Sequence, residues 1–287
     1  MTAAPIRRVF MAFEPSYWRG QLCTLSSLLR HADAPIDVEI LTRAEHNAAL
    51  DKVLAPVRRC HPQASITPLN LPAAELALCD GIGFASHFKA EILFRLFYFG
   101  LSRSSGNAAY VDIDTVVRTR IAALTEAMAP DLPLTALPQG AASGPILNWR
   151  PDMGSYFNSG VLLFNIERFG AEIDERMARA IALVPDMAGV CDYLDQDALN
   201  LAFDGRWAPL PHRFNHMTID TRPLDLASDH ILHATGSRKP WLLGGRHRYT
   251  ADYLAEIAAL GIPPWARQDP FWVLTRIKRQ IAAKLAR

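Results

Sequence analysis

Two aspartates two positions apart, Asp112 and Asp114, follow an apolar stretch in the segment YVDIDTVV. On a strand, positions i and i+2 project to the same side, so both carboxylates would face one way. Paired carboxylates suit a hard divalent cation, and the carboxyl edge of an α/β sheet is where ligands of such sheets bind. The pair therefore predicts a metal site, with two surface acids at a strand end as the structural alternative.

Amide side chains mark two further segments. Asn158 and Gly160 stand in YFNSGVLLFNI, where an amide can donate and accept hydrogen bonds and a glycine leaves room for close approach. In LDQDALN, Asp195 and Gln196 open a predicted helix, and Gln196 shares a helix face with Asn200. Such groups suit sugar hydroxyls and phosphates, whereas a tight turn and acids that complement a helix dipole are the structural alternatives.

The segment HATGSRKPW carries the last candidate residues. His233 offers a nitrogen ligand for a divalent cation, and Lys239 offers a point charge for a phosphate. Gly236 lies between His233 and Lys239, and Pro240 follows Lys239. Both residue types are typical of a turn, which would fix the shape of the segment.

A sheet is needed to bring these segments together. Apolar strands alternate with helical segments along the chain, the pattern of an α/β sheet with helices on its faces. We expect strands over 7–13, 36–42, 64–71, 108–117, 133–139 and 156–166. We expect helices over 17–31, 44–60, 87–101, 170–184, 194–203 and 250–260, and a long loop over 140–155.

Composition describes an ordinary folded domain. The 287 residues are 50% apolar and 21% charged, which is enough to bury one large core. No apolar run reaches the roughly 18 residues that cross a bilayer, and no secretory leader is recognised, so a cytoplasmic location is expected. The body of the chain carries more acids than bases, which argues against a nucleic-acid partner.

Taken in order, YVDIDTVV, YFNSGVLLFNIERF, DQDALN and HATGSRKPW resemble glycosyltransferase family 8 from about Arg8 to Trp241. The family includes bacterial lipooligosaccharide galactosyl- and glucosyltransferases, glycogenin and plant galacturonosyl- and galactinol-forming enzymes. The resemblance implies a single GT-A domain over 1–265, with a mostly parallel central sheet flanked by helices. It also implies transfer of galactose or glucose from a UDP-sugar to a glycan or glycolipid acceptor, in the assembly of bacterial cell-surface polysaccharide such as lipopolysaccharide.

The resemblance further implies a cofactor and a donor site. Mn²⁺, or another divalent cation, would be held by Asp112, Asp114 and His233 and by the diphosphate, and would act as a Lewis acid on the departing UDP. The Lys239 ammonium and the Gly236 backbone would offset the charge that develops on the diphosphate. The remaining donor contacts implied by the family are Ala12, Glu14, Tyr17, His87, Arg95, Asp112, Asn158 and Gly160.

The family retains the anomeric configuration of the sugar. Retaining hydrolases use a carboxylate nucleophile, but the residue that would lie beneath the anomeric carbon here is the amide of Gln196. We therefore favour attack from the front face, with Asp195 as nucleophile the alternative. Gln196 and Asp195 are the predicted catalytic residues.

The chain departs from the family at two places. Where the family's first strand usually ends in an Asp pair or Asp-x-Asn, FEPSY has Glu14 as its only acid and Ser16 in the amide position. LTALPQG has no acid where lipooligosaccharide galactosyltransferases of the family carry an aspartate near the acceptor. One alternative function is a UDP-sugar-binding protein without turnover. Another is a haloacid-dehalogenase phosphatase, whose D-x-D-x-[TV] motif Val116 completes, although that motif belongs to the first strand of its fold.

The C-terminal segment 266–287 is predicted to be a basic amphipathic helix. From 270 to 287 it holds five bases and no acid, and apolar residues recur at steps of three and four. This composition is typical of a helix in an anionic membrane interface, so a peripheral contact with the inner face of the membrane is expected. The alternative is a helix that packs its apolar stripe on the domain.

Overall fold

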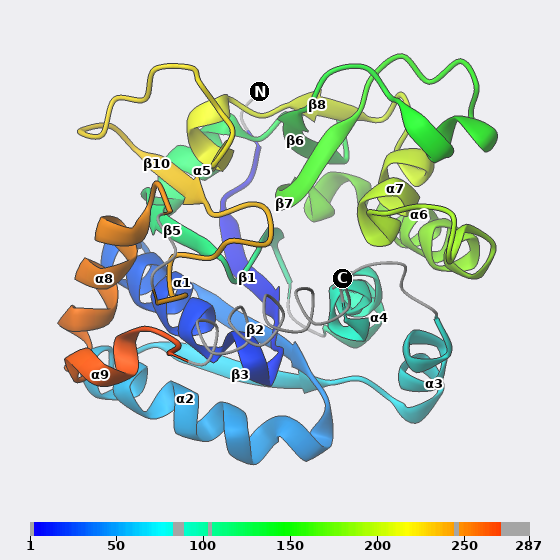
Figure 1. Cartoon of the computed structure of the whole chain (residues 1–287). Coiled ribbons are helices and arrows are strands. Elements are labelled where there is room, and N and C mark those ends of the chain that lie inside the picture. Colours follow the sequence, from blue (N-terminus) through cyan, green and yellow to red (C-terminus); the bar gives the residue numbers. More distant parts are fainter. Residues whose placement is uncertain (1–2, 83–88, 103–104, 244–246, 271–287) are drawn as a thin grey trace, which may run out of the picture.

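The computed structural model describes residues 3–82, 89–102, 105–243 and 247–270, and shows two sheets surrounded by helices (Figure 1). The strands are β1 (Ile6–Ala12), β2 (Asp37–Thr42), β3 (Ser65–Asn70), β4 (Asn107–Val111), β5 (Thr115–Arg118), β6 (Leu134–Pro138), β7 (Phe157–Phe164), β8 (Trp207–Pro209), β9 (His216–Met217) and β10 (His230–His233). The α-helices are α1 (Trp18–His31), α2 (Asn47–Cys60), α3 (Ala73–Gly81), α4 (Tyr98–Leu101), α5 (Ile121–Ala127), α6 (Ile166–Met187), α7 (Leu194–Ala202), α8 (Thr250–Ala259) and α9 (Pro264–Arg267). Short 3-10 segments are η1 (Pro15–Tyr17), η2 (Ala44–His46), η3 (Ala90–Phe97), η4 (Gly144–Asn148) and η5 (His212–Asn215).

The larger sheet has the strand order β3-β2-β1-β4-β7-β6-β8. Strand β7 pairs antiparallel with β4 and β6, and the other neighbouring strands pair parallel. The expected mostly parallel central sheet is therefore confirmed. A second sheet of order β5-β10-β9 lies beyond it, with β5 antiparallel and β9 parallel to β10.

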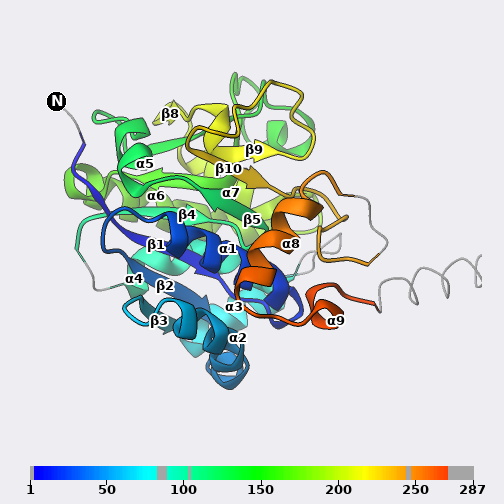
Figure 2. The ribbon, with the colours of Figure 1, turned by 90° about the vertical axis from the view of Figure 1, so that its left-hand side faces the viewer.

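Strand β1 is buried on both faces, which explains its continuous apolar sequence. Val9 and Met11 face a core that α1, α2 and α8 complete, whereas Phe10 and Ala12 face a core completed by η3, α6 and α7. Figure 2 shows α1 in front of β1, with α8 beside it. Within the described ranges, no helix is both long enough and apolar enough to cross a membrane.

The expected single strand over 108–117 is wrong. The segment forms two strands in different sheets, β4 and β5, and Asp112 and Asp114 lie in the turn between them. The Asp112 amide makes a last sheet-like bond to the Gly160 carbonyl (2.8 Å), and the Thr115 hydroxyl then donates to the Asp112 carbonyl (2.9 Å). The turn, rather than the alternation of a strand, sets the direction of the two carboxylates.

The expectation of one long α-helix over 87–101 is also wrong. Residues 83–88 lie outside the described part, and the chain then runs through the 3-10 segment η3 into the single turn of α4. The small sheet's β9 and β10, the edge strand β8 and helices α3 and α5 were not foreseen. Their segments are short, and three of them pair with strands distant in sequence. The predicted C-terminal helix falls outside the described residues beyond 270.

Helix α1 holds the turn through a stripe of small residues. Gly20, Thr24 and Ser27 recur at steps of four and three and lie on one face of the helix. The Thr24 hydroxyl donates to the Thr115 carbonyl (2.9 Å), and the Ser27 hydroxyl accepts from the Val117 amide (2.9 Å). Because β5 is an edge strand, these hydroxyls satisfy buried backbone groups that no neighbouring strand pairs.

Replacing Gly20 tests this close approach. A Cβ at Gly20 would lie 2.4 Å from the Ile113 carbonyl oxygen and 2.7 Å from the Trp241 ring. Alanine normally stabilises a helix interior relative to glycine, but here we expect Gly20→Ala to lower the free energy of unfolding by about 1–3 kcal/mol through overpacking. Gly170→Ala in α6 is the matched control, since its Cβ would have an ordinary contact of 3.6 Å. Urea denaturation that finds both variants stabilised would contradict this packing.

Candidate active site

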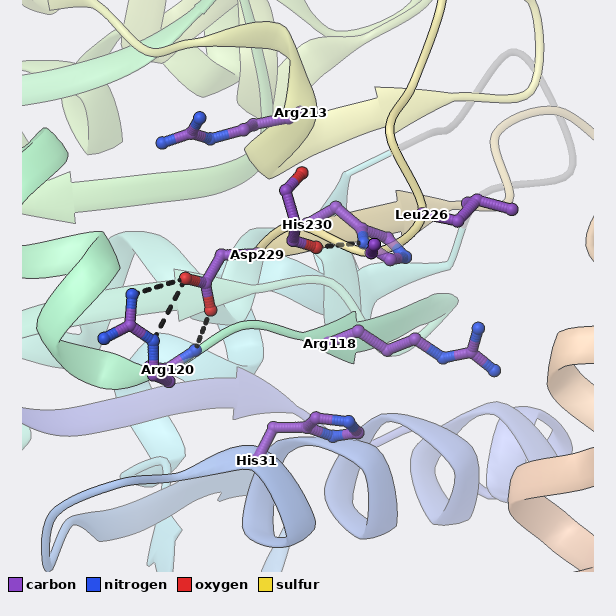
Figure 3. A pocket seen from close by; sticks show the side chains of 9 residues that line it. His31, Arg118, Arg120, Arg213, Leu226, Asp229 and His230 are labelled. Carbon is purple, nitrogen blue, oxygen red and sulfur yellow. Dashed lines mark hydrogen bonds and ion pairs between the residues drawn. The ribbon is translucent and has the colours of Figure 1, made fainter.

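The described part of the chain has two cavities that could serve as a site. The first, of about 410 Å³, is lined by residues from α1, β5, η5 and β10 and from the segments 119–120 and 226–229, and among them are Arg118, Arg120 and Arg213. Figure 3 shows that Arg118 and Arg213 point in opposite directions, while Arg120 is paired with Asp229 at 2.7 Å. The cations of this cavity do not converge on one point, and the predicted site residues are not among those that line it.

The second cavity, of about 510 Å³, opens at the carboxyl ends of β1 and β4. Twelve of the predicted residues line it: Ala12, Glu14, Tyr17, Arg95, Asp112, Asp114, Asn158, Asp195, Gln196, His233, Gly236 and Lys239. His87 lies outside the described residues. Gly160 is described but does not line the cavity.

Three side chains from two sheets form a cluster able to hold a metal ion. One ligand atom each of Asp112, Asp114 and His233 lie within 4.8 Å of one another. The His233 Nε2 atom is 3.2 Å from Asp114 Oδ1 and 3.6 Å from Asp112 Oδ2. His233 is positioned by β10, which pairs with β5 so that His233 faces Thr115 next to the aspartate turn.

Fixed cations offset the carboxylates of this cluster. The Asp112 Oδ1 atom accepts from Arg95 (2.9 Å) and from the Tyr110 hydroxyl (2.6 Å), which leaves Oδ2 directed at the cluster. Asp114 Oδ2 accepts from the Lys239 ammonium. Burial alone would raise the pKa of Asp114, but Lys239 and His233 together hold that pKa well below its usual value. Asp114 is therefore ionised at any physiological pH.

Asp195 sits at the first turn of α7 beside the same arginine. Its Oδ2 atom lies 3.1 Å from Arg95 Nε, and its side chain is 9% exposed. Burial raises the pKa of Asp195 to about 6; Arg95 opposes this shift and the Asp112 charge adds to it. Arg95 thus bridges two carboxylates, and its third contact, from Nη1 to the Ser159 carbonyl (2.9 Å), fixes it to β7.

The amide of Gln196 is held at both ends. Its Oε1 atom accepts from the Ser159 backbone amide (2.9 Å) and from Asn158 Nδ2 (3.0 Å), while its Nε2 atom donates to the Tyr156 hydroxyl (2.9 Å). Gln196 and Asn200 contact β7 from one face of α7, as their spacing predicted. Asn200 accepts a hydrogen bond from the Phe157 amide and donates one to the Phe157 carbonyl. These bonds dock the start of α7 on β7 and place Gln196 in the cavity wall.

The interpretation of Gly160 as a donor contact is not supported by its position. A Cβ at Gly160 would lie 2.1 Å from Cε1 and 2.6 Å from Nδ1 of His233. The glycine is needed because the imidazole ring packs on its Cα, behind the cavity wall. It therefore acts on the cluster through His233 rather than on a ligand.

Glu14 and Tyr17 line the cavity where the chain leaves β1, and Tyr17 lies close enough to Lys239 and Asp114 for their charges to act on its hydroxyl. The Lys89 ammonium lies 2.6 Å from Glu14 Oε1, and the Ser16 hydroxyl donates to Glu14 Oε2. Burial raises the pKa of Tyr17 above its usual value. Glu14 is therefore an acid paired with a cation, in a polar pocket between β1 and η3.

Sequence reasoning missed several residues that shape the cavity. Lys89, Tyr110 and Ser159 line it, and Asn215 supports it from behind. Lys89 and Asn215 belong to segments without a recognisable motif. Tyr110 could have been found, because it precedes Asp112 by two positions and its hydroxyl can reach the same carboxylate.

Comparisons with known proteins agree with this geometry. The profile of Glycosyl transferase family 8 matches residues 8–243. The chain is 28% identical over 251 residues to the lipopolysaccharide 1,2-glucosyltransferase of Escherichia coli strain K12, covering 79% of this chain and 70% of that protein. It is 24% identical over 271 residues to the probable galacturonosyltransferase-like 8 of Arabidopsis thaliana, covering 82% and 66%. It is 30% identical over 171 residues to the probable glycosyl transferase Gly of Streptococcus gordonii, covering 54% and 23%. The chain thus spans less than two thirds of the last two proteins.

Solved structures show the same fold. The galactosyltransferase LgtC in complex with donor and acceptor sugar analogs matches with a TM-score of 0.73 at 21% identity, covering 90% of this chain and 97% of that chain. The apo bifunctional WbbM matches with a TM-score of 0.69 at 20% identity, covering 92% and 52%. The fold is that of the GT-A class. The chain belongs to glycosyl transferase family 8, as its four motifs predicted.

The raised pKa of Asp195 predicts a pH-dependent stability. Because its pKa of about 6 in the fold exceeds the usual value, ionisation of Asp195 costs stability above pH 6, and this cost disappears as the pH falls toward 4. An asparagine side chain at this position would mimic the protonated form. In EDTA, Asp195→Asn should raise the free energy of unfolding by roughly 1–3 kcal/mol at pH 8 and by about a third of that at pH 4.5.

Asp229→Asn is the control, for which the free energy of unfolding should change in the opposite direction. The hydrogen bond from Arg120 lowers the pKa of Asp229, so this substitution should destabilise the protein to a similar extent at pH 8 and pH 4.5, since both values lie above the usual pKa of an aspartate. Urea denaturation at the two pH values measures both variants. A gain for Asp195→Asn that is equal at pH 8 and pH 4.5 would show that the effect is not ionisation.

Proposed function

We propose that the protein transfers a hexose, galactose or glucose, from a UDP-sugar to a glycan or glycolipid acceptor, with a divalent cation and with retention of configuration. The observation that carries this proposal is the cluster of Asp112, Asp114 and His233 at the mouth of the cavity. The site residues that the family implies and that line this cavity would bind the donor there.

The ligand atoms of the cluster fit a divalent cation. Two carboxylate oxygens and one imidazole nitrogen are a hard-to-borderline set that suits Mn²⁺ or a similar ion. Asp112 and Asp114 each keep one oxygen directed at the cluster, because Arg95 and Lys239 bind the other. When bound, the cation would act as a Lewis acid toward the diphosphate.

The diphosphate would meet a prepared electrostatic environment. Lys239 is 9% exposed and is fixed by the Ala234 carbonyl (2.9 Å) as well as by Asp114. Gly236 adopts a left-handed backbone conformation (φ 86°) in the turn between them, which leaves its amide free of a side chain above it. Together they would stabilise the negative charge that develops on the leaving UDP. Glu14 and Tyr17 would hold the ribose and uracil beyond Ala12.

The position of Gln196 favours attack from the front face. Its amide oxygen already accepts hydrogen bonds from Ser159 and Asn158, so its lone pairs are not available to attack the sugar. An amide is also a weak nucleophile. Asp195 is held against Arg95 and would contact the donor sugar as an acceptor of hydroxyl hydrogen bonds. Asp195 as the nucleophile of a double displacement is the second mechanism, and it requires a covalent glycosyl intermediate.

Assembly of a cell-surface glycan is supported by the similarity to the E. coli lipopolysaccharide glucosyltransferase. A cytoplasmic location and contact with an anionic membrane through 270–287 remain predictions from sequence. A UDP-sugar-binding protein without turnover is the other candidate function. The intact cluster and its paired cations favour the enzyme.

One assay tests the proposed function. The protein is incubated with UDP-glucose, UDP-galactose or UDP-N-acetylglucosamine, and release of UDP and the anomer of the product are followed by NMR. We expect release with one hexose donor, retained configuration, dependence on Mn²⁺, and a loss of at least about 100-fold in Asp114→Asn. Asp229→Asn, an aspartate of the other cavity, is the matched control and should keep activity. Full turnover in EDTA would contradict the metal site, and binding without UDP release would favour the alternative.

A further inference from the structure

Asn215 is a buried amide that touches the metal-site histidine from the side opposite the carboxylates. It ends η5, is fully buried, and its Oδ1 atom lies 2.8 Å from His233 Nδ1. Its Nδ2 atom donates to Asn158 Oδ1 (2.9 Å). Asn215 therefore lies between a predicted metal ligand and a predicted donor contact.

The direction of each hydrogen bond follows from one backbone group. The Gly160 amide can only donate, and it donates to Asn158 Oδ1 (3.0 Å). The Asn215 atom that faces the same oxygen must also donate, which identifies it as Nδ2. Asn215 Oδ1 then faces His233, so His233 Nδ1 must carry the hydrogen. The lone pair of Nε2 is thereby available on the side of Asp112 and Asp114.

The ring of His233 is fixed in place as well as in its tautomer. The ring packs against the Cα of Gly160, where no Cβ could fit. The hydrogen bond to Asn215 prevents rotation about χ2, which would exchange the two sides of the ring. A hydrogen-bonded partner on the far nitrogen is the usual device that orients a ligating histidine.

The same chain of amides reaches the sugar end of the cavity. Asn158 donates through Nδ2 to Gln196 Oε1 (3.0 Å), which also accepts from the Ser159 amide (2.9 Å). The backbone amides of Ser159 and Gly160 in β7 can only donate. They therefore determine which atoms of the neighbouring side-chain amides donate and which accept.

We infer that Asn215 is a positioning residue, which holds His233 with Nδ1 protonated and Nε2 directed at the cation, and which joins that ligand to Asn158. The inference rests on the proposed function for the cation, but the hydrogen bond to Nδ1 can be measured without it. Asn215 would act through His233 and touch neither the sugar nor the reacting atoms.

Two substitutions separate this role from simple packing. Asn215→Leu keeps the branched shape of the side chain and removes both hydrogen bonds, whereas Asn215→Asp keeps an acceptor for His233 Nδ1 and loses the donor to Asn158. Mn²⁺ affinity in the presence of UDP, measured by electron paramagnetic resonance of the free ion, should fall about 10–100-fold in Asn215→Leu. It should stay within about fivefold of the wild type in Asn215→Asp, even if that variant is less stable.

Asn165→Leu is the matched control. Asn165 is a buried amide that donates to the carbonyls of Ala129 and Pro130. Its loss should lower stability without changing Mn²⁺ affinity. Mn²⁺ affinity unchanged in Asn215→Leu, or equally weak in Asn215→Asp, would overturn the positioning role.

Histidine ¹⁵N NMR distinguishes a failure of this inference from a failure of the proposed function. In the metal-free wild type, His233 should show a slowly exchanging proton on Nδ1, and Asn215→Leu should lose it. A wild type that keeps this proton but does not bind Mn²⁺ would contradict the metal site and leave the hydrogen bond standing. An Nδ1 without a proton in the protein loaded with UDP and Mg²⁺ would contradict the inference.

Discussion

The site depends on holding three carboxylates close together beside fixed cations. Without those cations, the like charges of Asp112, Asp114 and Asp195 would repel one another. Arg95 lies between two of them and Lys239 binds the third, so each negative charge has a fixed positive neighbour. The remaining carboxylate oxygens and the His233 nitrogen then form a set of acceptors that a divalent cation would complete.

This arrangement requires elements from distant parts of the chain. The turn of Asp112 and Asp114 joins the two sheets, and the hydroxyls of α1 hold its far side through the edge of β5. His233 lies on β10, and its ring packs against Gly160 of β7. Close contacts of backbone with backbone or ring, made possible by Gly20 and Gly160, therefore decide where the charged groups lie.

The four motifs predicted the family and eight of the residues that line the cavity, because residue type and spacing carry their chemistry. The central sheet was predictable from its apolar runs. The break between β4 and β5 was not, since the apolar pattern continues on both sides of Asp112, and only pairing with β10 separates the strands. Asn215 could not be predicted for a related reason. One amide in a short 3-10 segment has no periodicity, and its place in the site is set by contacts with Asn158 of β7 and His233 of β10.

The most direct test of the account is the position of the cation itself. Crystals grown with UDP and Mn²⁺ should give an anomalous difference peak bounded by Asp112 Oδ2, Asp114 Oδ1 and His233 Nε2, with diphosphate oxygens as further ligands. Asp112 Oδ1 should remain bonded to Arg95 and Tyr110. A peak at any other place, or UDP bound in this cavity with no cation between the diphosphate and these three side chains, would contradict the central claim.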